Sequence, residues 1–253
     1  MKKGFLVLAT AIMVFAFTSC LDLNSDNNYV KAFRCMVTVT TGGVNPVFQI
    51  DNGPFLTQET AVPADTFVVG ERYCLYYVLG DTVNHPVNSY PIDLYQYVKT
   101  ILKNPVVLPK DSTNKWEDQP IIDFSAQFTG HYLNAFFISY AGLSTPNTFE
   151  LIRLKEDETA LVTDTFPKLY FALRHNVAVI SSSYTIYQYY SYDLSSLTTE
   201  FPNATKFQIN LSWNDAGLGT MEGPSTYIPE QTILGPMIFS SIQMNSDLLP
   251  TPF

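Results

Sequence analysis

The sequence is poor in basic residues. Lysine and arginine together number 14 against 23 acidic residues, which gives a net charge of −9. Proteins that bind nucleic acids carry basic patches that neutralise phosphates, and this chain has few lysines and arginines to form such a patch. Docking on an anionic membrane through charge alone is excluded for the same reason. We therefore expect no nucleic-acid partner.

The motifs of the common enzyme classes are also missing. The chain contains no Gly-x-Ser-x-Gly elbow, no His-Glu-x-x-His zinc motif and no phosphate-binding glycine loop. Its histidines, His85, His131 and His175, lie too far apart for metal-ligand spacing. We therefore predict no catalytic residue, no metal and no cofactor, and hence no enzyme. A carboxylate pair of the glycosidase kind leaves no sequence signature, so a glycan-active hydrolase stays as a third alternative.

Cysteine is scarce, and the chain contains only Cys20, Cys35 and Cys74. Cys35 and Cys74 both fall in strand-like runs, where free cysteine is often buried. An exported protein meets an oxidising compartment, so a disulfide between them is the other interpretation. Both remain open at this point, because the sequence does not give the Cα separation that a disulfide requires.

The first twenty residues have the features of an export signal. Lys2 and Lys3 precede an apolar run over residues 4–17, which is shorter than the roughly 20 residues of a transmembrane helix and suits the hydrophobic region of a signal peptide. The next segment ends at Cys20 with the letters FTSC and resembles the lipobox of bacterial lipoproteins. The resemblance implies that residues 1–19 are removed and that lipid on Cys20 provides the membrane anchor. Removal of both lysines lowers the net charge from −9 to −11.

The rest of the chain favours strands, because aromatic residues make up 14% of it and β-branched residues are frequent. Residues 20–28 are polar and without periodicity, and are predicted to form a tether. Residues 29–104 contain four or five strand-like runs, as expected for a small barrel or sandwich. Residues 105–120 combine three prolines with mixed charges and are predicted to be a linker. The clearest runs of the first block are Val30–Thr41, Pro46–Ile50, Arg72–Leu79 and Tyr90–Val98.

A second strand-rich block covers residues 121–213. Its runs are spaced as in a β-sandwich, and Thr129-Gly130 marks a hairpin turn. Residues 214–253 are rich in glycine and proline and are predicted to pack on the sandwich as an extension, with one further strand or loop within Thr232–Gln243. No amphipathic helix is predicted. The runs of the second block are Ile121–Phe128, His131–Tyr140, Phe149–Lys155, Leu161–Asp164, Lys168–His175, Ser183–Asp193 and Lys206–Trp213.

Short segments of both blocks occur in an order that matches a known family. They are Cys20–Asp22, Phe48–Gly53, Pro91–Tyr95, Asp123, His131–Asn134, Leu169–Asn176 and Tyr192–Leu194. Through them the chain resembles the NigD-like lipoproteins of Bacteroidota. The resemblance implies an all-β chain in which an N-terminal OB-fold-like small barrel precedes a C-terminal antiparallel β-sandwich. It also implies anchoring to the outer membrane, on the periplasmic or the surface face, while the family's biochemical role is largely uncharacterised.

Tyrosines are concentrated between Tyr184 and Tyr192. Alternation places Tyr187 and Tyr189 on one strand face, where an exposed row would suit a sugar or a protein partner. The other interpretation is that these tyrosines only decorate an ordinary strand. We therefore expect an envelope-anchored, non-catalytic binding or accessory module for a glycan or a partner protein. The alternative is an envelope assembly or bacteriocin-associated interaction protein without a small ligand.

Overall fold

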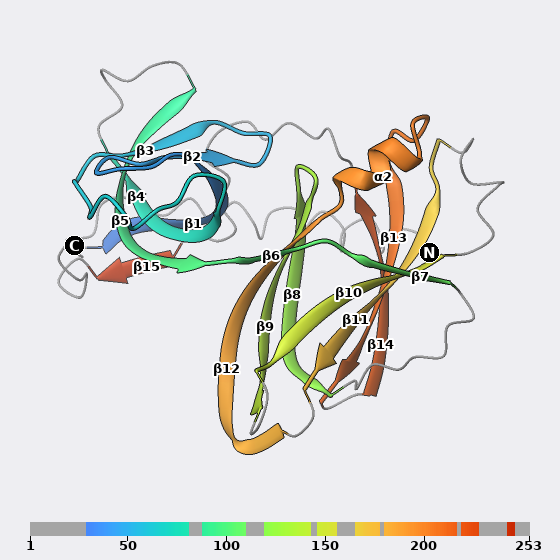
Figure 1. Ribbon diagram of the computed structural model, residues 1–253. Coiled ribbons are helices and arrows are strands. Elements are labelled where there is room, and N and C mark those ends of the chain that lie inside the picture. The colour runs from blue at the N-terminus through green and yellow to red at the C-terminus, as the bar shows by residue number, and fades with distance from the viewer. Residues whose placement is uncertain are drawn as a thin grey trace, which may run out of the picture.

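The computed structural model describes residues 29–80, 88–109, 119–142, 146–155, 165–177, 180–216, 219–227 and 242–245. Nearly all regular structure in these ranges is β-strand, and Figure 1 shows a small barrel beside a larger sandwich. The all-β class predicted from the sequence is therefore confirmed. Within the same ranges, no helix has both the length and the apolar character needed to cross a membrane.

Five strands form the barrel in the order β1-β2-β3-β5-β4, and β4 pairs back onto β1 to close it. β3 and β5 are parallel, whereas the other neighbours in the ring are antiparallel. The small N-terminal barrel that the resemblance implied is therefore present as a closed five-stranded barrel. The strands are β1 (Tyr29–Thr41), β2 (Val47–Ile50), β3 (Phe55–Gln58), β4 (Arg72–Leu79) and β5 (Ser89–Lys99).

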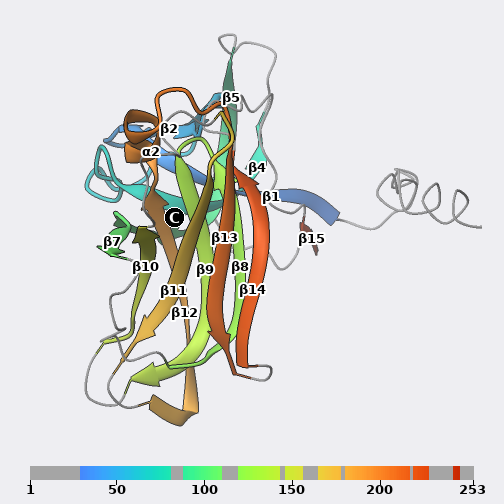
Figure 2. The same cartoon turned by 90° about the vertical axis from the view of Figure 1, so that its right-hand side faces the viewer.

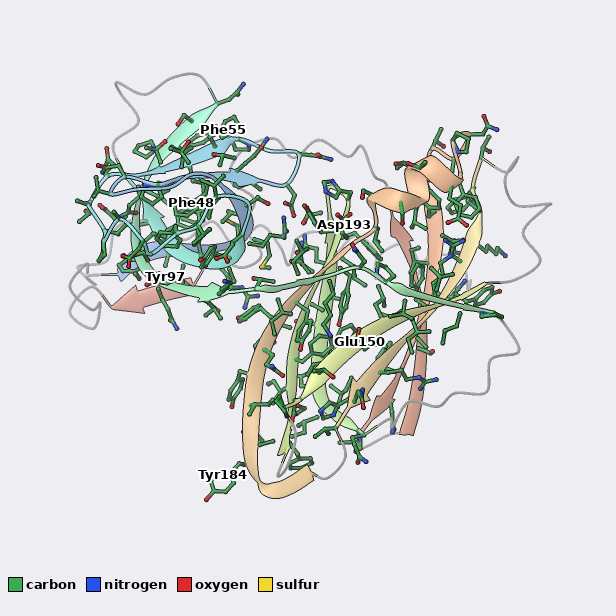
Figure 3. The ribbon with its side chains drawn as sticks, viewed as in Figure 1. Phe48, Phe55, Tyr97, Glu150, Tyr184 and Asp193 are labelled. Carbon is green, nitrogen blue, oxygen red and sulfur yellow. The ribbon has the colours of Figure 1, made fainter. Side chains whose placement is uncertain are left out.

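Aromatic side chains fill the barrel. Phe48 has no exposed surface and meets Phe67 edge-on, with ring centres 4.9 Å apart (Figure 3). Tyr73 packs against the same Phe67 at 5.0 Å. Because edge-to-face pairs add stabilisation beyond the area they bury, these rings give the barrel a core of its own.

The sandwich is built from a nine-stranded sheet that folds over itself. A single residue pair, Asp215 with Ile121, joins β13 to β8 and connects two layers, β6-β12-β9-β8 and β14-β13-β11-β10-β7. Figures 1 and 2 show these layers from two directions. The strands are β6 (Ile101–Lys103), β7 (Val106–Pro109), β8 (Ile121–Thr129), β9 (Tyr132–Gly142), β10 (Thr148–Lys155), β11 (Lys168–Asn176), β12 (Ile180–Asp193), β13 (Phe207–Asp215) and β14 (Gly219–Tyr227).

The two layers meet through stacked rings. Phe137 of β9 lies parallel to Phe149 of β10 with ring centres 4.1 Å apart. Tyr190 of β12 packs edge-on against both at 5.5–5.6 Å. All three side chains are buried, so β12 turns Tyr190 and its neighbour Tyr192 into the core. Its alternate residues consequently face outwards.

The sandwich differs from the expected antiparallel arrangement, because it contains parallel pairs as well. β6 runs parallel to β12 in one layer, and β7 runs parallel to β10 in the other. The short segment of residues 101–109 therefore lies along both layers. The prediction of a linker over residues 105–120 is wrong for Val106–Pro109, which form β7. Pro109 is tolerated there because β7 is an edge strand of the sheet.

The described strands of the C-terminal extension are divided between two bodies, the barrel and the sandwich. β14, a strand that was not predicted, pairs with β13 on the sandwich, and β15 (Ile242–Asn245) pairs with β1 on the barrel. The reason is that the first residues of β1, Tyr29–Ala32, extend beyond the part that pairs with β4 and offer unpaired backbone groups. Figure 1 shows β15 beside β1. Most of the predicted Thr232–Gln243 element lies outside the described residues.

A short helix that was not predicted, α2 (Ser195–Glu200), follows β12. It buries only Leu197, so its sequence has no amphipathic period to recognise. The predicted strand over Leu161–Asp164 lies outside the described residues.

Candidate functional site

A buried ion pair lies on the barrel wall that the sandwich covers. Arg72, at the start of β4, donates to both carboxylate oxygens of Asp51, at 2.7 Å and 2.8 Å. The two side chains are 0% and 2% exposed. The alternation of β4 turns Tyr73 and Leu75 into the barrel, so Arg72 lies on the outside of it, where the sandwich covers it.

The ion pair continues into the sandwich as a hydrogen-bond network. Arg72 also donates to Asn134 of β9 at 3.0 Å, and Thr129 of β8 donates to Asp51 at 2.6 Å. Asn134 in turn donates to Thr129 and accepts from Ser191 of β12. The Arg72 guanidinium carbon lies 3.5 Å from the centre of the Tyr132 ring. Since breaking this network would leave buried charges without partners, it holds the two bodies together.

Gly130 allows the β8–β9 hairpin to approach the barrel. Its φ of +54° lies in the left-handed region, and a Cβ there would come within 3.1 Å of the Asp51 Cβ. The hairpin tip therefore rests directly on Asp51. The turn predicted at Thr129-Gly130 is thus a contact between the two bodies.

The outer face of β8, β9 and β12 consists of rows of three residues, one from each strand. Gln127, Asn134 and Ser191 form the row nearest the ion pair, followed by Ser125, Phe136 and Tyr189, and then by Asp123, Ile138 and Tyr187. The first row is covered by the barrel, because Asn134 and Ser191 are buried there. The third row is open, with Tyr187 64% exposed.

Three rings connect the covered end of this face to the open end, and we call Phe136, Tyr187 and Tyr189 the aromatic stripe. The Phe136 ring lies 4.8 Å from that of Tyr189 and 6.2 Å from that of Tyr187, stacked on the latter at an interplanar angle of 21°. The stripe thus offers a nearly continuous apolar surface that runs from solvent towards the barrel.

The aromatic stripe ends at a pocket of about 190 Å³ between the two bodies. Strands β1 and β4 of the barrel form one wall, and β8, β9 and β12 form the other. The pocket is lined by Arg34, Met36, Cys74, Ser125, Ala126, Gln127, Asn134, Ala135, Phe136 and Tyr189. Its lining therefore combines apolar surface with a few hydrogen-bonding groups, as small-molecule sites do.

Arg34 and Tyr189 are linked at the pocket through Tyr76. The phenol oxygens of Tyr76 and Tyr189 lie 2.7 Å apart, and the Arg34 guanidinium donates to Tyr76. Burial raises the pKa of Tyr189, and the hydrogen bond with Tyr76 raises it further. Burial lowers the pKa of Arg34, but the hydrogen bond to Tyr76 and the electrostatic interactions with Tyr76, Tyr189 and Cys74 together outweigh it, so the pKa is raised and the guanidinium stays charged.

Acid–base groups are scarce at the pocket. Its described lining includes no carboxylate and no histidine, and burial raises the pKa of its one thiol, Cys74, to about 12. His175 lies elsewhere, fully buried and stacked on Phe149 at 4.6 Å. In the part of the chain that the structure describes, no cluster of three or more His, Cys, Asp or Glu side chains is arranged for a metal.

The two internal cysteines point to opposite sides of the barrel wall. Cys35 lies opposite Leu75, and Cys74 lies opposite Met36 on the neighbouring strand. Cys35 belongs to the barrel core, whereas Cys74 lines the pocket. Both are free, buried thiols. Of the two interpretations that the sequence left open, the structure therefore agrees with buried free cysteines and not with a disulfide.

The predicted site residues lie as follows. Tyr187 and Tyr189 share the outer face of β12, with Tyr187 exposed and Tyr189 half-buried at the pocket. Tyr184, further along β12, is 70% exposed and points away from the molecule (Figure 3). Cys20, the predicted lipidation site, lies outside the described residues.

Sequence reasoning missed Arg34, Phe136 and Gln127. Alternation in β9 and β12 would have placed Phe136 beside Tyr189, had the register of the two strands been known. No signal in the sequence shows that β1 of the barrel brings Arg34 to the same place, because this depends on how the two bodies pack.

Comparisons with known proteins give similar folds but no close relative. No protein-family model matches the chain, and no curated protein matches it. A solved structure of a protein of unknown function, DUF1344, from Bacteroides vulgatus has a TM-score of 0.62 at 18% identity, with 86% of this chain and 98% of that one covered. A NigD-like immunity protein from Bacteroides caccae has a TM-score of 0.53 at 16% identity, with 79% and 97% covered.

A candidate lipoprotein from Bacteroides fragilis is similar in the same way, with a TM-score of 0.55 at 15% identity over 78% of this chain and 98% of that one. At these identities the comparisons show a shared fold. The resemblance to NigD-like proteins inferred from the sequence is therefore confirmed at the level of the fold.

Proposed function

From the fold shared with NigD-like proteins, we propose that this chain is a lipid-anchored, non-catalytic protein of the bacterial envelope that binds a carbohydrate at the aromatic stripe and its pocket. The observation that carries the proposal is the arrangement of Tyr187, Phe136 and Tyr189, which leads from open solvent into a pocket that carries several hydrogen-bonding groups. The export signal and Cys20 support the envelope location, on the periplasmic or the surface face of the outer membrane.

The chemistry of the stripe suits a sugar. One face of a pyranose ring is lined with C–H groups that pack on an aromatic ring, while its hydroxyls need hydrogen-bond partners at the edge. The stripe provides the rings, and Ser125, Gln127 and Arg34 provide donors and acceptors beside them. A pocket of about 190 Å³ is smaller than the roughly 300–1,000 Å³ typical of drug-sized ligands, so one sugar unit would enter it.

The barrel contributes its outer wall rather than its usual ligand face. OB-folds bind oligosaccharides on the face around strands 2 and 3. Here the pocket uses β1 and β4, through residues that point away from the barrel core. The proposal therefore depends on the site itself and does not use the analogy with other OB-folds.

The decisive experiment compares two tyrosine variants in binding to a panel of bacterial and host glycans. Tyr187→Ala removes an exposed ring from the stripe, and Tyr170→Ala removes an exposed ring from β11, which does not line the pocket. We expect binding by the wild type and by Tyr170→Ala, and a loss of about tenfold or more in affinity for Tyr187→Ala. Equal affinities in the three proteins would exclude the stripe as the binding surface.

A partner protein is the second candidate. One structural neighbour is named an immunity protein, and the barrel of this chain exposes three valines, Val44, Val68 and Val69, at 52–61%. Because Val44 lies beyond the far end of β1 from the predicted tether, this surface would face away from the anchor. Crosslinking in intact cells, followed by identification of one stoichiometric protein, would favour this candidate over carbohydrate binding.

A further inference from the structure

Arg34 is the one charged side chain in the described lining of the pocket. It has no carboxylate partner among the described residues: its guanidinium donates to the Tyr76 hydroxyl, and the Tyr189 phenol and the Cys74 thiol act on it electrostatically. Four other basic side chains are paired with acids: Arg72 with Asp51, Lys99 with Glu71, Lys103 with Glu150 and Arg153 with Glu200. Within the described part of the chain, Arg34 thus brings a positive charge into the pocket that no carboxylate balances.

The surroundings of Arg34 favour an anionic ligand group. Phenols accept hydrogen bonds from the guanidinium but do not neutralise its charge. A half-buried charge is screened less by salt than a surface one, so it attracts an anion more strongly. The planar guanidinium presents paired N–H donors that match the two oxygens of a carboxylate.

A negatively charged side chain lies one row further from the barrel than Phe136 and Tyr189. Asp123 is exposed on β8, in the same row as Ile138 and Tyr187. A second carboxylate on the ligand would meet this negative charge once the first had reached Arg34. The face therefore suits a ligand with its acid at one end and neutral units along the aromatic stripe.

We propose that the pocket recognises a terminal uronic acid, with the sugar carboxylate on Arg34 and the sugar ring against Phe136 and Tyr189. This inference rests on the proposed carbohydrate function and names the sugar class. The pocket admits a single sugar ring, and Arg34 pairs with its carboxylate. Asp123 would repel a carboxylate on the next unit, so the acid is restricted to the end of the glycan. A glycan of this kind would extend over Tyr187 towards solvent.

The test uses two sugars that differ only at C6, methyl β-glucuronide and methyl β-glucoside. Binding to the wild-type protein is measured by calorimetry and by NMR of the arginine Nε–H signals. We expect the glucuronide to bind about tenfold or more tightly than the glucoside and to shift the Arg34 signal. Arg34→Met should lose this preference and Arg34→Lys should keep part of it, whereas Lys168→Met, which removes an exposed charge on β11, should keep all of it.

The outcomes separate this inference from the function on which it rests. Equal affinity for the two sugars, or a preference that persists in Arg34→Met, overturns the uronate while leaving a carbohydrate ligand in place. Failure of both sugars and of the glycan panel to bind overturns both proposals, as does binding of an acidic peptide in their place. If Arg34→Met fails to fold, the NMR titration of the wild-type protein still tests whether the glucuronide contacts Arg34.

Discussion

The hydroxyls of Tyr76 and Tyr189 lie 2.7 Å apart and join the outer wall of the barrel to the outer face of the sandwich. Tyr76 comes from β4 and Tyr189 from β12, so the bond links residues far apart in the chain. It lies beside the pocket, and Arg34 donates to the same Tyr76 oxygen. The contact thus couples the packing of the two bodies to the shape of the candidate site.

Removing this bond should cost a modest amount of stability. We expect Tyr189→Phe to lower the free energy of unfolding by about 1 kcal/mol, because a partly buried hydroxyl on Tyr76 loses its partner. The double variant Tyr76→Phe/Tyr189→Phe should be less destabilised than the sum of the single variants. Urea denaturation followed by circular dichroism measures these values, with Tyr170→Phe on exposed surface as the control. Additive effects of the two changes would mean that the hydroxyls do not interact.

The ion pair between Asp51 and Arg72 should matter far more. Removing one member of a buried pair leaves the other charge uncompensated, at a cost of about 3–5 kcal/mol. We therefore expect Asp51→Asn and Arg72→Met each to lower the urea concentration at the unfolding midpoint strongly, as measured by denaturation followed by tryptophan fluorescence. The surface pair provides the control, because Lys99 is 61% exposed and Lys99→Met should move the midpoint much less. Similar shifts for the two pairs would contradict the structural role of the network.

Local pattern identified much of this fold. Alternation and β-branched residues marked most of the longer strands, including β1, β4, β9 and β12, and they placed Tyr187 and Tyr189 on one face. β3, β6 and β7 were missed because three or four residues hardly show a period of two, whereas β2, which is equally short, was found because turn residues flank it on both sides. The parallel pairing of β6 with β12 was missed because nothing in a local pattern reports which distant strand will lie alongside.

The candidate site could be predicted only in part for a related reason. The aromatic stripe follows from the sequence of β12 once β9 is known to be its neighbour. Arg34 stands between Phe33 and Cys35 in β1, and that pattern is the same whether the arginine faces solvent or a pocket. Its position depends on how the barrel docks, which Asp51, Arg72 and Asn134 determine through hydrogen bonds between segments far apart in the chain.

The two internal cysteines should remain free thiols after export. Cys35 and Cys74 point to opposite sides of the barrel wall, so a disulfide would require the backbone to move. In a Cys20→Ser variant we expect neither thiol to react with a thiol reagent in the native protein and both to react after unfolding in urea. Mass spectrometry of the non-reduced protein provides the check, since a mass lower by two hydrogens would reveal a disulfide and contradict this assignment.

Alkaline pH should destabilise the fold partly through Cys74. Burial raises the pKa of this thiol from 9.0 to about 12, so the folded state holds its proton where the unfolded state has lost it. The corresponding stabilisation is fully present below pH 9 and is lost as the pH rises from 9 towards 12. Burial also raises the pKa of Tyr190 to about 12, which acts in the same direction. Urea midpoints measured between pH 8 and pH 11 should therefore fall less steeply in Cys74→Ala than in the wild type, and parallel curves would show that this thiol does not contribute.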